Sequence, residues 1–296
     1  MNTTSVPRHL GSGDVVAVIG LGKMGLPMAR NLARAGFDVV GYDVVAEARD
    51  RARAEGLRAA ESVADATRGA RLVLLVVGFD AEVLETTTGP GGVLTAAMPG
   101  AVVAVCSTVE PETVRKVEHA ARPHGVHVLD TPVARGEPAA EDGSLLVLCG
   151  GDAALLDAVS APLHAIGSDI YRLGPVGAGQ VGKMLNNYLL WSCVVANHEV
   201  MRLGSRLGLS LEPLREALLM SSGANWALDT WTRSRPMPWA EEDMRVLREY
   251  AEGVGLELPL AEAVEREITD IKRRKNAWTA GGGSASSMDA FTRSLS

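Results

Sequence analysis

The chain is poor in the residue types that mark several large classes of protein. Aromatic residues make up only 4% of its 296 residues, and cysteine occurs three times, at Cys106, Cys149 and Cys193. Three cysteines in apolar surroundings do not form a disulfide framework, and neither they nor the histidines show the spacing of a metal site. We therefore expect buried, reduced thiols, a cytoplasmic location and no bound metal.

Long apolar runs and an excess of positive charge are also missing. No stretch reaches the roughly 18 apolar residues that a membrane helix needs, and the first dozen residues hold no apolar signal-peptide core. The formal net charge is -7, which argues against a nucleic-acid or membrane surface. The hydrophobic fraction of 47% is ample for a packed core. These features predict a globular protein whose partner is a small molecule.

Strand-like apolar runs alternate with helical stretches in the first part of the chain and then stop. Such alternation is typical of an α/β fold with a doubly wound, mostly parallel sheet. We expect a flexible N-terminus at 1–13, a Rossmann domain at 14–174, an all-α domain at 175–275 and a flexible tail at 276–296. The runs lie at Val15 to Ile19, Asp38 to Tyr42, Leu72 to Val77, Ala101 to Cys106, Val126 to Leu129, Leu145 to Cys149 and Ile170 to Leu173.

A long helix is predicted to open the second half of the chain, from about Gln180 to Leu207. It is apolar on nearly all sides, so we expect it to be buried on most of them. The charged run KRRK, from Lys272 to Lys275, is typical of a helix C-terminus, where cations complement the helix dipole. Three further helices are expected at Leu211 to Met220, Ala240 to Glu252 and Pro259 to Lys275.

The most informative segment runs from Val15 to Asp43, where an apolar strand meets a glycine-rich turn and a helix. Gly20 permits the tight turn, Gly22 lets the backbone approach a pyrophosphate, and Gly25 lets the helix pack close to the sheet. The pyrophosphate would sit on the free N–H groups of the helix N-terminus. This pattern predicts a dinucleotide site, and its turn also includes Leu21, Lys23 and Met24.

Asp43 ends the second strand, where a carboxylate accepts hydrogen bonds from ribose hydroxyls and repels a 2′-phosphate. Val44 and Val45 follow it, where an NADP site more often has arginine or a hydroxyl residue. The sequence therefore favours NAD over NADP. An alternative is that Asp43 caps the next helix.

Lys183 is the best candidate for acid/base chemistry. It stands near the start of the long apolar helix, just after the domain boundary, and Asn187 follows one turn later on the same face. A nicotinamide cofactor carries the hydride, so the protein has to supply a proton donor and acceptor. The alternative is a lysine that extends from a helix end into solvent.

Four blocks, taken together, resemble the β-hydroxyacid dehydrogenase family of 3-hydroxyisobutyrate dehydrogenase and tartronate semialdehyde reductase. The resemblance covers about Asp14 to Lys275. The blocks are GLGKMGLPMARNL (Gly20 to Leu32), CSTVEPETVRK (Cys106 to Lys116), DTPVARGEPAAEDGSLLVLCGG (Asp130 to Gly151) and GxGxxxKxxxN (Gly177 to Asn187).

The resemblance implies an NAD(P)-dependent oxidoreductase that interconverts a 3-hydroxy acid and its aldehyde or ketone, and that forms at least a homodimer. Lys183 matches the family's catalytic lysine, and Asn187 matches its substrate-orienting amide. Thr108 matches the threonine beside the nicotinamide, while Val77 and Gly78 match the loop that crosses the cofactor.

Two positions depart from the family pattern. The usual Ser-Gly-Gly substrate loop reads Ala134, Arg135 and Gly136 here, so a hydroxyl is replaced and a guanidinium is gained. Arg135 either binds the anion of a small substrate or is a loop residue that faces solvent or pairs with Glu137. The lysine usually found before Asp243 is replaced by Glu242, which puts tight closure over the cofactor in doubt.

Trp226 belongs to a tryptophan-containing segment that borders the substrate cleft in relatives, so it is a candidate for substrate contact, although packing explains most tryptophans. Two other functions remain open. One is an imine reductase or reductive aminase, whose members usually lack the catalytic lysine. The other is a cofactor-binding scaffold without catalysis.

Overall fold

The computed structural model describes residues 8–233, 237–280 and 287–295. The chain divides into two compact units, Met1–Lys183 and Met184–Ser296, which we describe separately as unit 1 and unit 2. Within the described part of the chain, no helix combines the length and the apolar character needed to cross a membrane.

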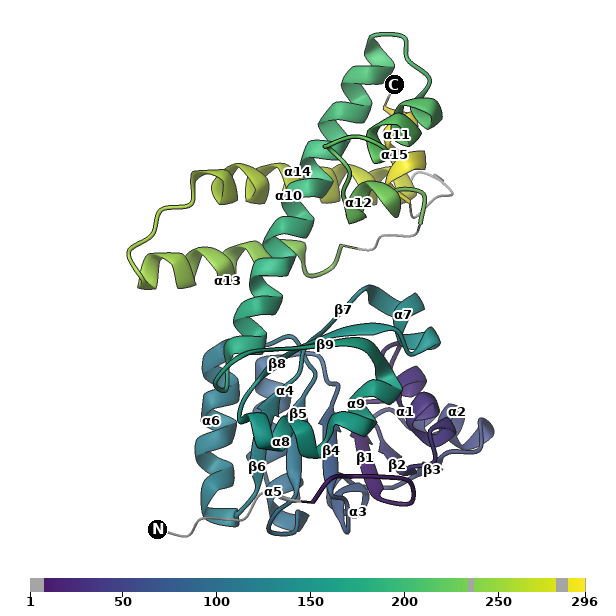
Figure 1. Cartoon of the computed structure of the whole chain (residues 1–296). Helices are drawn as coiled ribbons and strands as arrows, with labels where there is room; N and C mark the ends of the chain where they lie inside the picture. Colours follow the sequence, from purple (N-terminus) through teal and green to yellow (C-terminus); the bar gives the residue numbers. More distant parts are fainter. Residues whose placement is uncertain (1–7, 234–236, 281–286, 296) are drawn as a thin grey trace. The chain divides into compact units, whose positions relative to one another are not determined.

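Unit 1 is built on a nine-stranded sheet in the order β3-β2-β1-β4-β5-β6-β8-β7, with β9 paired to β8 (Figure 1). The pairs from β3 to β6 are parallel, β6 and β7 run antiparallel to β8, and β9 runs parallel to it. The bounds are β1 Val15–Ile19, β2 Asp38–Tyr42, β3 Arg58–Ala59, β4 Leu72–Leu75, β5 Val102–Val105, β6 His127–Asp130, β7 Val133–Ala134, β8 Leu145–Gly150 and β9 Gly167–Gly174.

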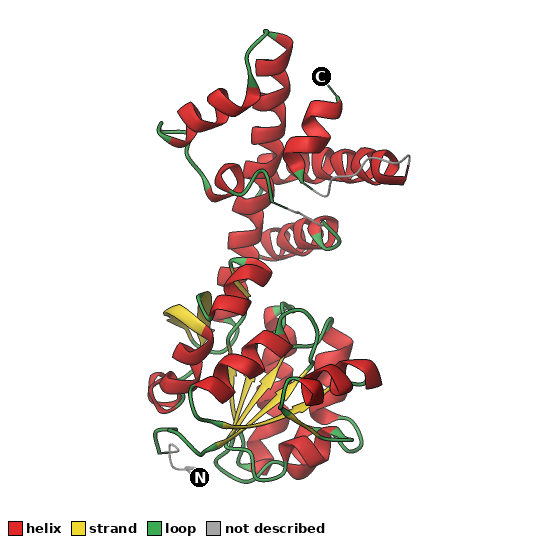
Figure 2. Ribbon diagram, turned by 90° about the vertical axis from the view of Figure 1, so that its right-hand side faces the viewer, coloured by secondary structure: helices red, strands yellow, loops and turns green. Residues whose placement is uncertain are grey.

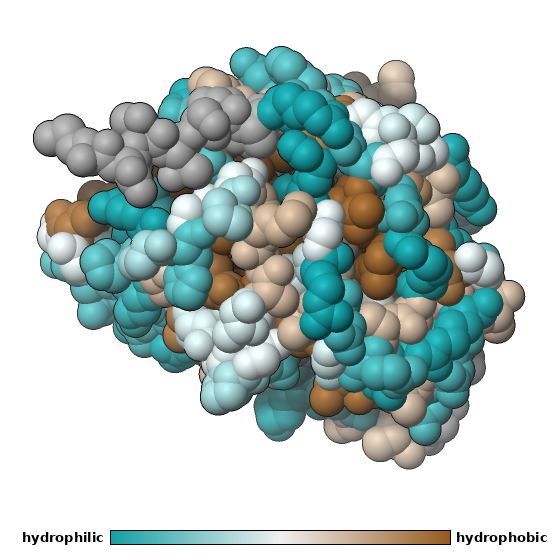
Figure 3. Space-filling model, turned by 90° about the horizontal axis from the view of Figure 1, so that it is seen from below, coloured by the Kyte–Doolittle hydropathy of each residue, from teal (hydrophilic) through white to brown (hydrophobic). Residues whose placement is uncertain are grey.

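Helices cover both faces of this sheet, which Figure 2 shows as a central layer of strands with helices on either side. One core lies under α1, α2, α7, α8 and α9, and the other under α3, α4, α5 and α6. Mostly polar side chains cover the face seen in Figure 3, with apolar ones between them. The bounds are α1 Gly25–Arg34, α2 Ala46–Ala54, α3 Val63–Thr67, α4 Asp80–Thr88, α5 Val93–Ala96, α6 Pro111–Ala121, α7 Gly136–Asp142, α8 Ala153–Ala158 and α9 Ser160–Ile166.

The predicted doubly wound α/β fold is confirmed, with differences at its edges. The sequence gives no signal for β3 and β7, because strands of two residues are too short to show a periodicity. The segment 8–13 was expected to be flexible, but Leu10 is buried and its N–H bonds the carbonyl of Ala158 at 2.8 Å. Residues 1–7 of that prediction lie outside the described residues.

Unit 2 is helical, as predicted, and has a core of its own. Its first helix, α10, begins in unit 1 and continues through unit 2. One side of α10 is buried within this chain, whereas Leu189 and Leu203 are 65% and 60% exposed, so burial of the helix on most sides stays a prediction that requires a second subunit. The bounds are α10 Ala178–Arg206, α11 Leu211–Leu219, α12 Trp226–Asp229, α13 Ala240–Gly253, α14 Pro259–Ala280 and α15 Met288–Ser294.

The C-terminal region is more ordered than its composition suggests. The predicted tail at 276–296 contains the last turn of α14 and the helix α15, whose Phe291 is fully buried. Ser287 caps α15 by accepting the N–H of Ala290 at 3.3 Å. The run Lys272 to Lys275 lies inside α14 rather than at its end, and Lys275 is buried.

His198 connects the first helix of unit 2 with the last. Its ring is stacked on Phe291 at 5.6 Å between centroids, and Nδ1 lies 3.1 Å from Oγ1 of Thr292. Burial, assisted by the charges of Arg202 and Arg274, lowers the pKa of His198 from 6.5 to about 4. The ring is therefore neutral in the folded protein at pH 7.

This lowered pKa predicts a loss of stability on acidification. The unfolded chain binds a proton near pH 6.5 and the folded chain only near pH 4, so the stabilisation falls as the pH drops through this window. We expect the free energy of unfolding to fall by about 2 kcal/mol more between pH 7 and pH 5 in the wild type than in His198→Gln. Urea unfolding at both pH values measures this, and an equal fall in the two proteins would contradict it.

Candidate active site

The glycine turn after β1 has the geometry that a dinucleotide requires. Gly20 has a positive φ of 99°, and a Cβ there would lie 2.2 Å from the carbonyl oxygen of Val76. A Cβ on Gly25 would lie 1.8 Å from the carbonyl oxygen of Gly20, so only glycine lets α1 start this close to the strand. Around Gly22 no atom lies within 4 Å of the same position. The turn thus has open space where a pyrophosphate would approach the backbone.

The side chains of this turn differ in how far they are exposed. Leu21 is fully buried, Lys23 is exposed, and Met24 directly precedes the first helical residue of α1. Nζ of Lys23 lies 3.1 Å from Oε1 of Glu137, which belongs to the first turn of α7. Glu137 is therefore the partner of Lys23, and the expected alternative that it pairs with Arg135 was wrong.

Asp43 joins the end of β2 to the glycine turn. Its Oδ2 accepts the N–H of Leu21 at 2.7 Å, and its Oδ1 accepts the N–H of Val45 at 2.8 Å. Each carboxylate oxygen has two lone pairs, so both can accept a second hydrogen bond from a ribose. The bond to Val45 holds the residue that precedes α2, but Val45 is itself the N-cap and no side chain caps this helix, so the capping alternative for Asp43 was wrong.

Two more loops leave the same edge of the sheet, because β4 and β5 are parallel to β1. Val77 and Gly78 follow β4, and the N–H of Val77 donates to Oγ of Ser107 at 2.9 Å. Thr108 follows β5 and is exposed, whereas its neighbours Ser107 and Val109 are 4% and 7% exposed. The loops that carry the predicted cofactor contacts are thus tied to one another by a hydrogen bond.

Asp130 fixes the start of α10 at this edge. The residue ends β6, is fully buried, and accepts the N–H of Gly177 on Oδ1 and that of Gln180 on Oδ2, each at 2.8 Å. Burial raises the pKa of Asp130, while the hydrogen bonds from these backbone N–H groups oppose the rise. A carboxylate in this position also complements the positive end of the helix dipole.

Gln180 is a second polar residue of the site that our reasoning from the sequence missed. It is 1% exposed, and its side-chain amide bonds the backbone on both sides of Thr108. Oε1 accepts the N–H of Val109 at 3.1 Å, and Nε2 donates to the carbonyl of Ser107 at 2.8 Å. The sequence held one signal for Gln180. An amide in an apolar helix, three residues before Lys183, needs hydrogen-bond partners if it is buried.

Lys183 lies in the N-terminal part of α10, less than one turn after Gln180, and is half-buried. It is the last residue of unit 1, which places it in the same compact unit as the cofactor loops. Asn187, one turn further along the helix, is 8% exposed and belongs to unit 2. Nδ2 of Asn186 donates to Oδ1 of Asn187 at 3.2 Å.

The turn between β7 and α7 has an unusual backbone. Arg135 has a positive φ of 84°, and the next residue, Gly136, has one of 76°. Its Nη1 donates to Oδ2 of Asp169 at 2.6 Å, and to the carbonyl of Ser144 and Oγ of Ser168 at 3.0 Å each. A non-glycine residue adopts this conformation only when its surroundings hold it there. The three contacts of Arg135 supply that restraint, and the preceding Ala134 is buried.

The remaining predicted residues lie in unit 2. Trp226 is the first residue of α12 and is 48% exposed. Glu242 lies in the first turn of α13, with Oε1 at 4.0 Å from Nη2 of Arg245. The following residue, Asp243, accepts the indole N–H of Trp191 at 2.8 Å and so links α13 to α10.

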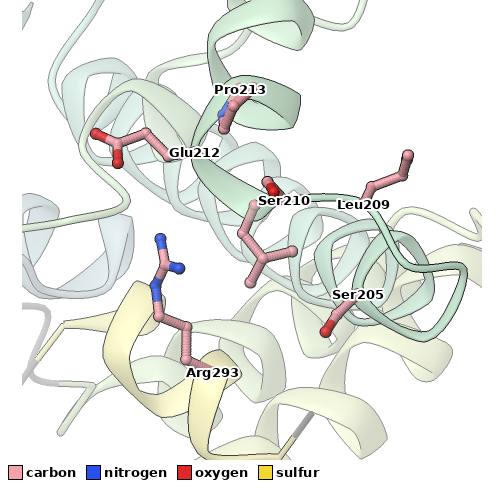
Figure 4. Close-up of a pocket in the computed structure, with 7 residues that line it drawn as sticks. Ser205, Leu209, Ser210, Glu212, Pro213 and Arg293 are labelled. Atoms are coloured by element: carbon pink, nitrogen blue, oxygen red, sulfur yellow. The ribbon is translucent and has the colours of Figure 1, made fainter.

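A separate groove of about 590 Å³ lies on unit 2, where α15 faces the start of α11 (Figure 4). Figure 4 shows the side chain of Arg293 rising from α15 toward α11. None of the predicted site residues lines this groove. Its lining consists of Ser205, Leu209, Ser210, Leu211, Glu212, Pro213 and Arg293.

The fold and the glycine turn define a dinucleotide-binding oxidoreductase with a Rossmann unit and a helical unit. Residues 15–174 match the family described as the NAD binding domain of 6-phosphogluconate dehydrogenase. Residues 177–280 match the one described as NAD-binding of NADP-dependent 3-hydroxyisobutyrate dehydrogenase.

Two individual relatives show which members of this family the chain resembles. The NAD-dependent L-serine dehydrogenase of Pseudomonas aeruginosa is 39% identical over 238 residues, which are 80% of this chain and 79% of that protein. The structure of Mycobacterium tuberculosis 3-hydroxyisobutyrate dehydrogenase with L-serine has a TM-score of 0.79, at 27% identity over 96% of this chain and 99% of that chain. The chain belongs to the β-hydroxyacid dehydrogenase family, whose members use a nicotinamide cofactor and act on a CH–OH group.

Imine reductases share the fold at a greater distance. The enzyme from Myxococcus stipitatus, a V8 variant in complex with NAD+, has a TM-score of 0.63 at 19% identity over 96% of this chain and 100% of that chain. Identity this low supports only a common fold. The hydroxyacid dehydrogenase interpretation is therefore favoured over the imine reductase alternative.

Proposed function

We propose that the chain oxidises a small 3-hydroxy acid with NAD and that Lys183 is the general acid/base. The observation that carries this proposal is the anchoring of α10. Asp130 and Gln180 hold the first turn of the helix to the edge where the cofactor loops emerge, and Lys183 follows directly. A bound nicotinamide supplies the hydride acceptor. Lys183 accepts the hydroxyl proton during oxidation and returns it to the alkoxide during reduction.

Asn187 orients the substrate in this proposal. It lies on the same face of α10 as Lys183, since residues four apart on a helix are neighbours. Its amide can accept a hydrogen bond from the substrate and donate another. An amide in this position would hold the hydroxyl toward Lys183 without competing for the proton.

The cofactor would be held by residues of unit 1 alone. The backbone from Gly20 to Gly25 would receive the pyrophosphate, with Lys23 and Met24 supplying N–H groups or local contacts, while the N–H of Leu21 is bonded to Asp43 and the residue supplies a local contact. Val77, Gly78 and Thr108 would lie along the nicotinamide half. Asp43 would accept hydrogen bonds from the adenosine ribose and so favour NAD over NADP, because its charge repels a 2′-phosphate.

The substrate anion would be bound at the turn formed by Ala134, Arg135 and Gly136. The contacts of Arg135 to Asp169, Ser168 and Ser144 are all made by Nη1. A guanidinium has five N–H donors. Nε and Nη2 make none of these three contacts, so they can donate to a substrate carboxylate while Nη1 keeps its partners. Trp226 remains a candidate from the sequence alone for an apolar contact with the substrate.

Two compounds are the first substrates to test. The relatives described above are named for L-serine and for 3-hydroxyisobutyrate, and both compounds carry a primary hydroxyl two carbons from a carboxylate. This arrangement suits a site with one proton acceptor and one anion-binding turn. We propose both as substrates of this chain.

We also propose a homodimer formed through α10. Four apolar residues, Leu185, Leu189, Val200 and Leu203, are 45% to 65% exposed. Their spacing places them on one face of the helix. A second copy of this chain would cover that face with the same residues, as in a twofold interface.

Kinetics of two variants would separate the proposed roles of Lys183 and Arg135. Lys183→Ala should lower kcat about 100- to 10,000-fold with L-serine or 3-hydroxyisobutyrate and leave the Kd for NAD within about threefold. Arg135→Gly, which suits the positive φ, should raise KM about tenfold or more and change kcat less. Wild-type NAD binding without hydride transfer would contradict the proposed function and support a scaffold.

Replacing the charge of Asp43 tests the cofactor preference. Asp43→Asn keeps an acceptor for the N–H of Leu21 but removes the carboxylate that repels a 2′-phosphate. The ratio of kcat/KM with NAD to that with NADP should fall at least about tenfold. A wild type that prefers NADP, or an unchanged ratio in the variant, would reject this role.

The dimer can be tested by sedimentation velocity at micromolar concentration. Leu189→Glu should shift the protein toward the monomer, because a charge would be buried in the interface. Val254→Glu is the matched control, since Val254 is 78% exposed and follows α13 rather than lying on α10. A wild-type monomer, or an equal effect of both variants, would exclude this interface.

A further inference from the structure

We propose that Gln180 is a positioning residue that sets the distance between Lys183 and the Thr108 loop. This inference rests on the proposed function of Lys183 and assigns Gln180 a role that it exerts through Lys183 and the Thr108 loop. It starts from the hydrogen bonds of a single buried amide.

The side chain of Gln180 pairs with the backbone in the manner of a neighbouring β-strand. It accepts from Val109 at 3.1 Å and donates to Ser107 at 2.8 Å, so it brackets Thr108. Both backbone groups are buried, and an amide is the side chain that can satisfy a donor and an acceptor at once. The exposed side chain of Thr108 is thereby presented outward from a fixed loop.

The backbone of Gln180 is also fixed by a hydrogen bond. Its own N–H donates to Asp130 at 2.8 Å, and this bond anchors the helix that carries Lys183. The backbone of Gln180 is therefore bonded to the end of β6. Its side chain is bonded to the loop that follows β5. Because Gln180 and Lys183 are three residues apart on α10, any shift of the loop relative to the helix changes the position of Thr108 relative to Lys183.

The connection extends to a third loop. Ser107, whose carbonyl is bound by Gln180, also accepts the N–H of Val77 through its hydroxyl at 2.9 Å. The loops expected to lie along the nicotinamide are thus linked to the helix that carries Lys183 by a continuous set of hydrogen bonds, of which those made by Gln180 are buried and that of Val77 is partly buried. In such a network, a small displacement of the reacting groups lowers the catalytic rate but leaves substrate affinity nearly unchanged.

The test compares Gln180→Met with a control that loses a similar amide. Methionine has nearly the same volume but leaves the N–H of Val109 and the carbonyl of Ser107 without their partner. The control is Asn31→Leu, because Asn31 is 9% exposed and its amide donates to the carbonyl of Ala140 at 2.8 Å, away from this network.

Backbone hydrogen exchange and kinetics give separate readouts. In Gln180→Met, exchange at Val109 should rise about tenfold or more, and exchange at Val77 should also increase. With L-serine or 3-hydroxyisobutyrate as the probe, kcat should fall about 10- to 100-fold while KM and the Kd for NAD stay within about threefold. Asn31→Leu should show none of these changes.

Gln180→Glu supplies a conservative rescue. A protonated carboxyl group has one donor and one acceptor in the arrangement of the amide, whereas the ionised group places an oxygen against the carbonyl of Ser107. The kcat of this variant, relative to the wild type, should therefore recover as the pH is lowered from 9 to 6. The relative kcat of Gln180→Met should stay flat, which a loss of stability alone would not explain.

The two proposals can fail independently. A wild-type protein that oxidises neither probe with NAD would overturn the proposed function, whatever the exchange data show. Wild-type kcat together with unchanged exchange at Val109 in Gln180→Met would overturn the role of Gln180. An equal loss of kcat in Asn31→Leu would also overturn it.

Discussion

The buried carboxylate of Asp130 is the contact on which the candidate site depends. It sits where the parallel part of the sheet ends and receives the first N–H groups of α10. A Cβ on Gly179 would lie 2.8 Å from Oδ2, and a Cβ on Gly150 would lie 2.2 Å from Oδ1. Glycines on both sides of the carboxylate therefore make room for it, and the strand edge and the helix approach each other more closely than larger residues would allow.

This anchoring explains how Lys183, which lies on a helix, comes to the same edge of the sheet as the loops that follow three different strands. The cofactor turn follows β1, and the loops with Val77 and Thr108 follow β4 and β5. Parallel strands bring their carboxyl ends to one edge, and this is where ligands bind in doubly wound folds. The first turn of α10 reaches the same edge through Asp130 and Gln180, so Lys183, the proposed proton-transfer group, and the loops proposed to hold the cofactor share one support.

The sequence predicted the sheet, the order of the helices and the glycine turn, because each of these is encoded by a local pattern. Lys183 and Asn187 could also be proposed from a local pattern, since their spacing places them on one helix face. The roles of Asp130 and Gln180 could not be found in this way. Their partners lie far away along the chain, and a buried polar residue shows its importance only when its contacts are known.

Two other features of the structure that differ from the sequence-based predictions also have specific causes. Arg135 pairs with Asp169, which becomes its neighbour only because β7 and β9 both pair with β8. The helix α15 was missed because the glycines and serines before it dominate the composition of that region. Its own signals, a serine cap at Ser287 and a phenylalanine one turn later, are short and were outweighed.

The burial of Phe291 also affects how the protein is made. Phe291 and Thr292 contact His198 in the first helix of unit 2, so the two ends of this unit complete one core. During synthesis the Rossmann unit can fold as soon as its strands have left the ribosome, because domains fold as units in order of emergence. The core of the helical unit is completed only when its last helix is added, and until then the side of α10 that Phe291 covers stays exposed to water.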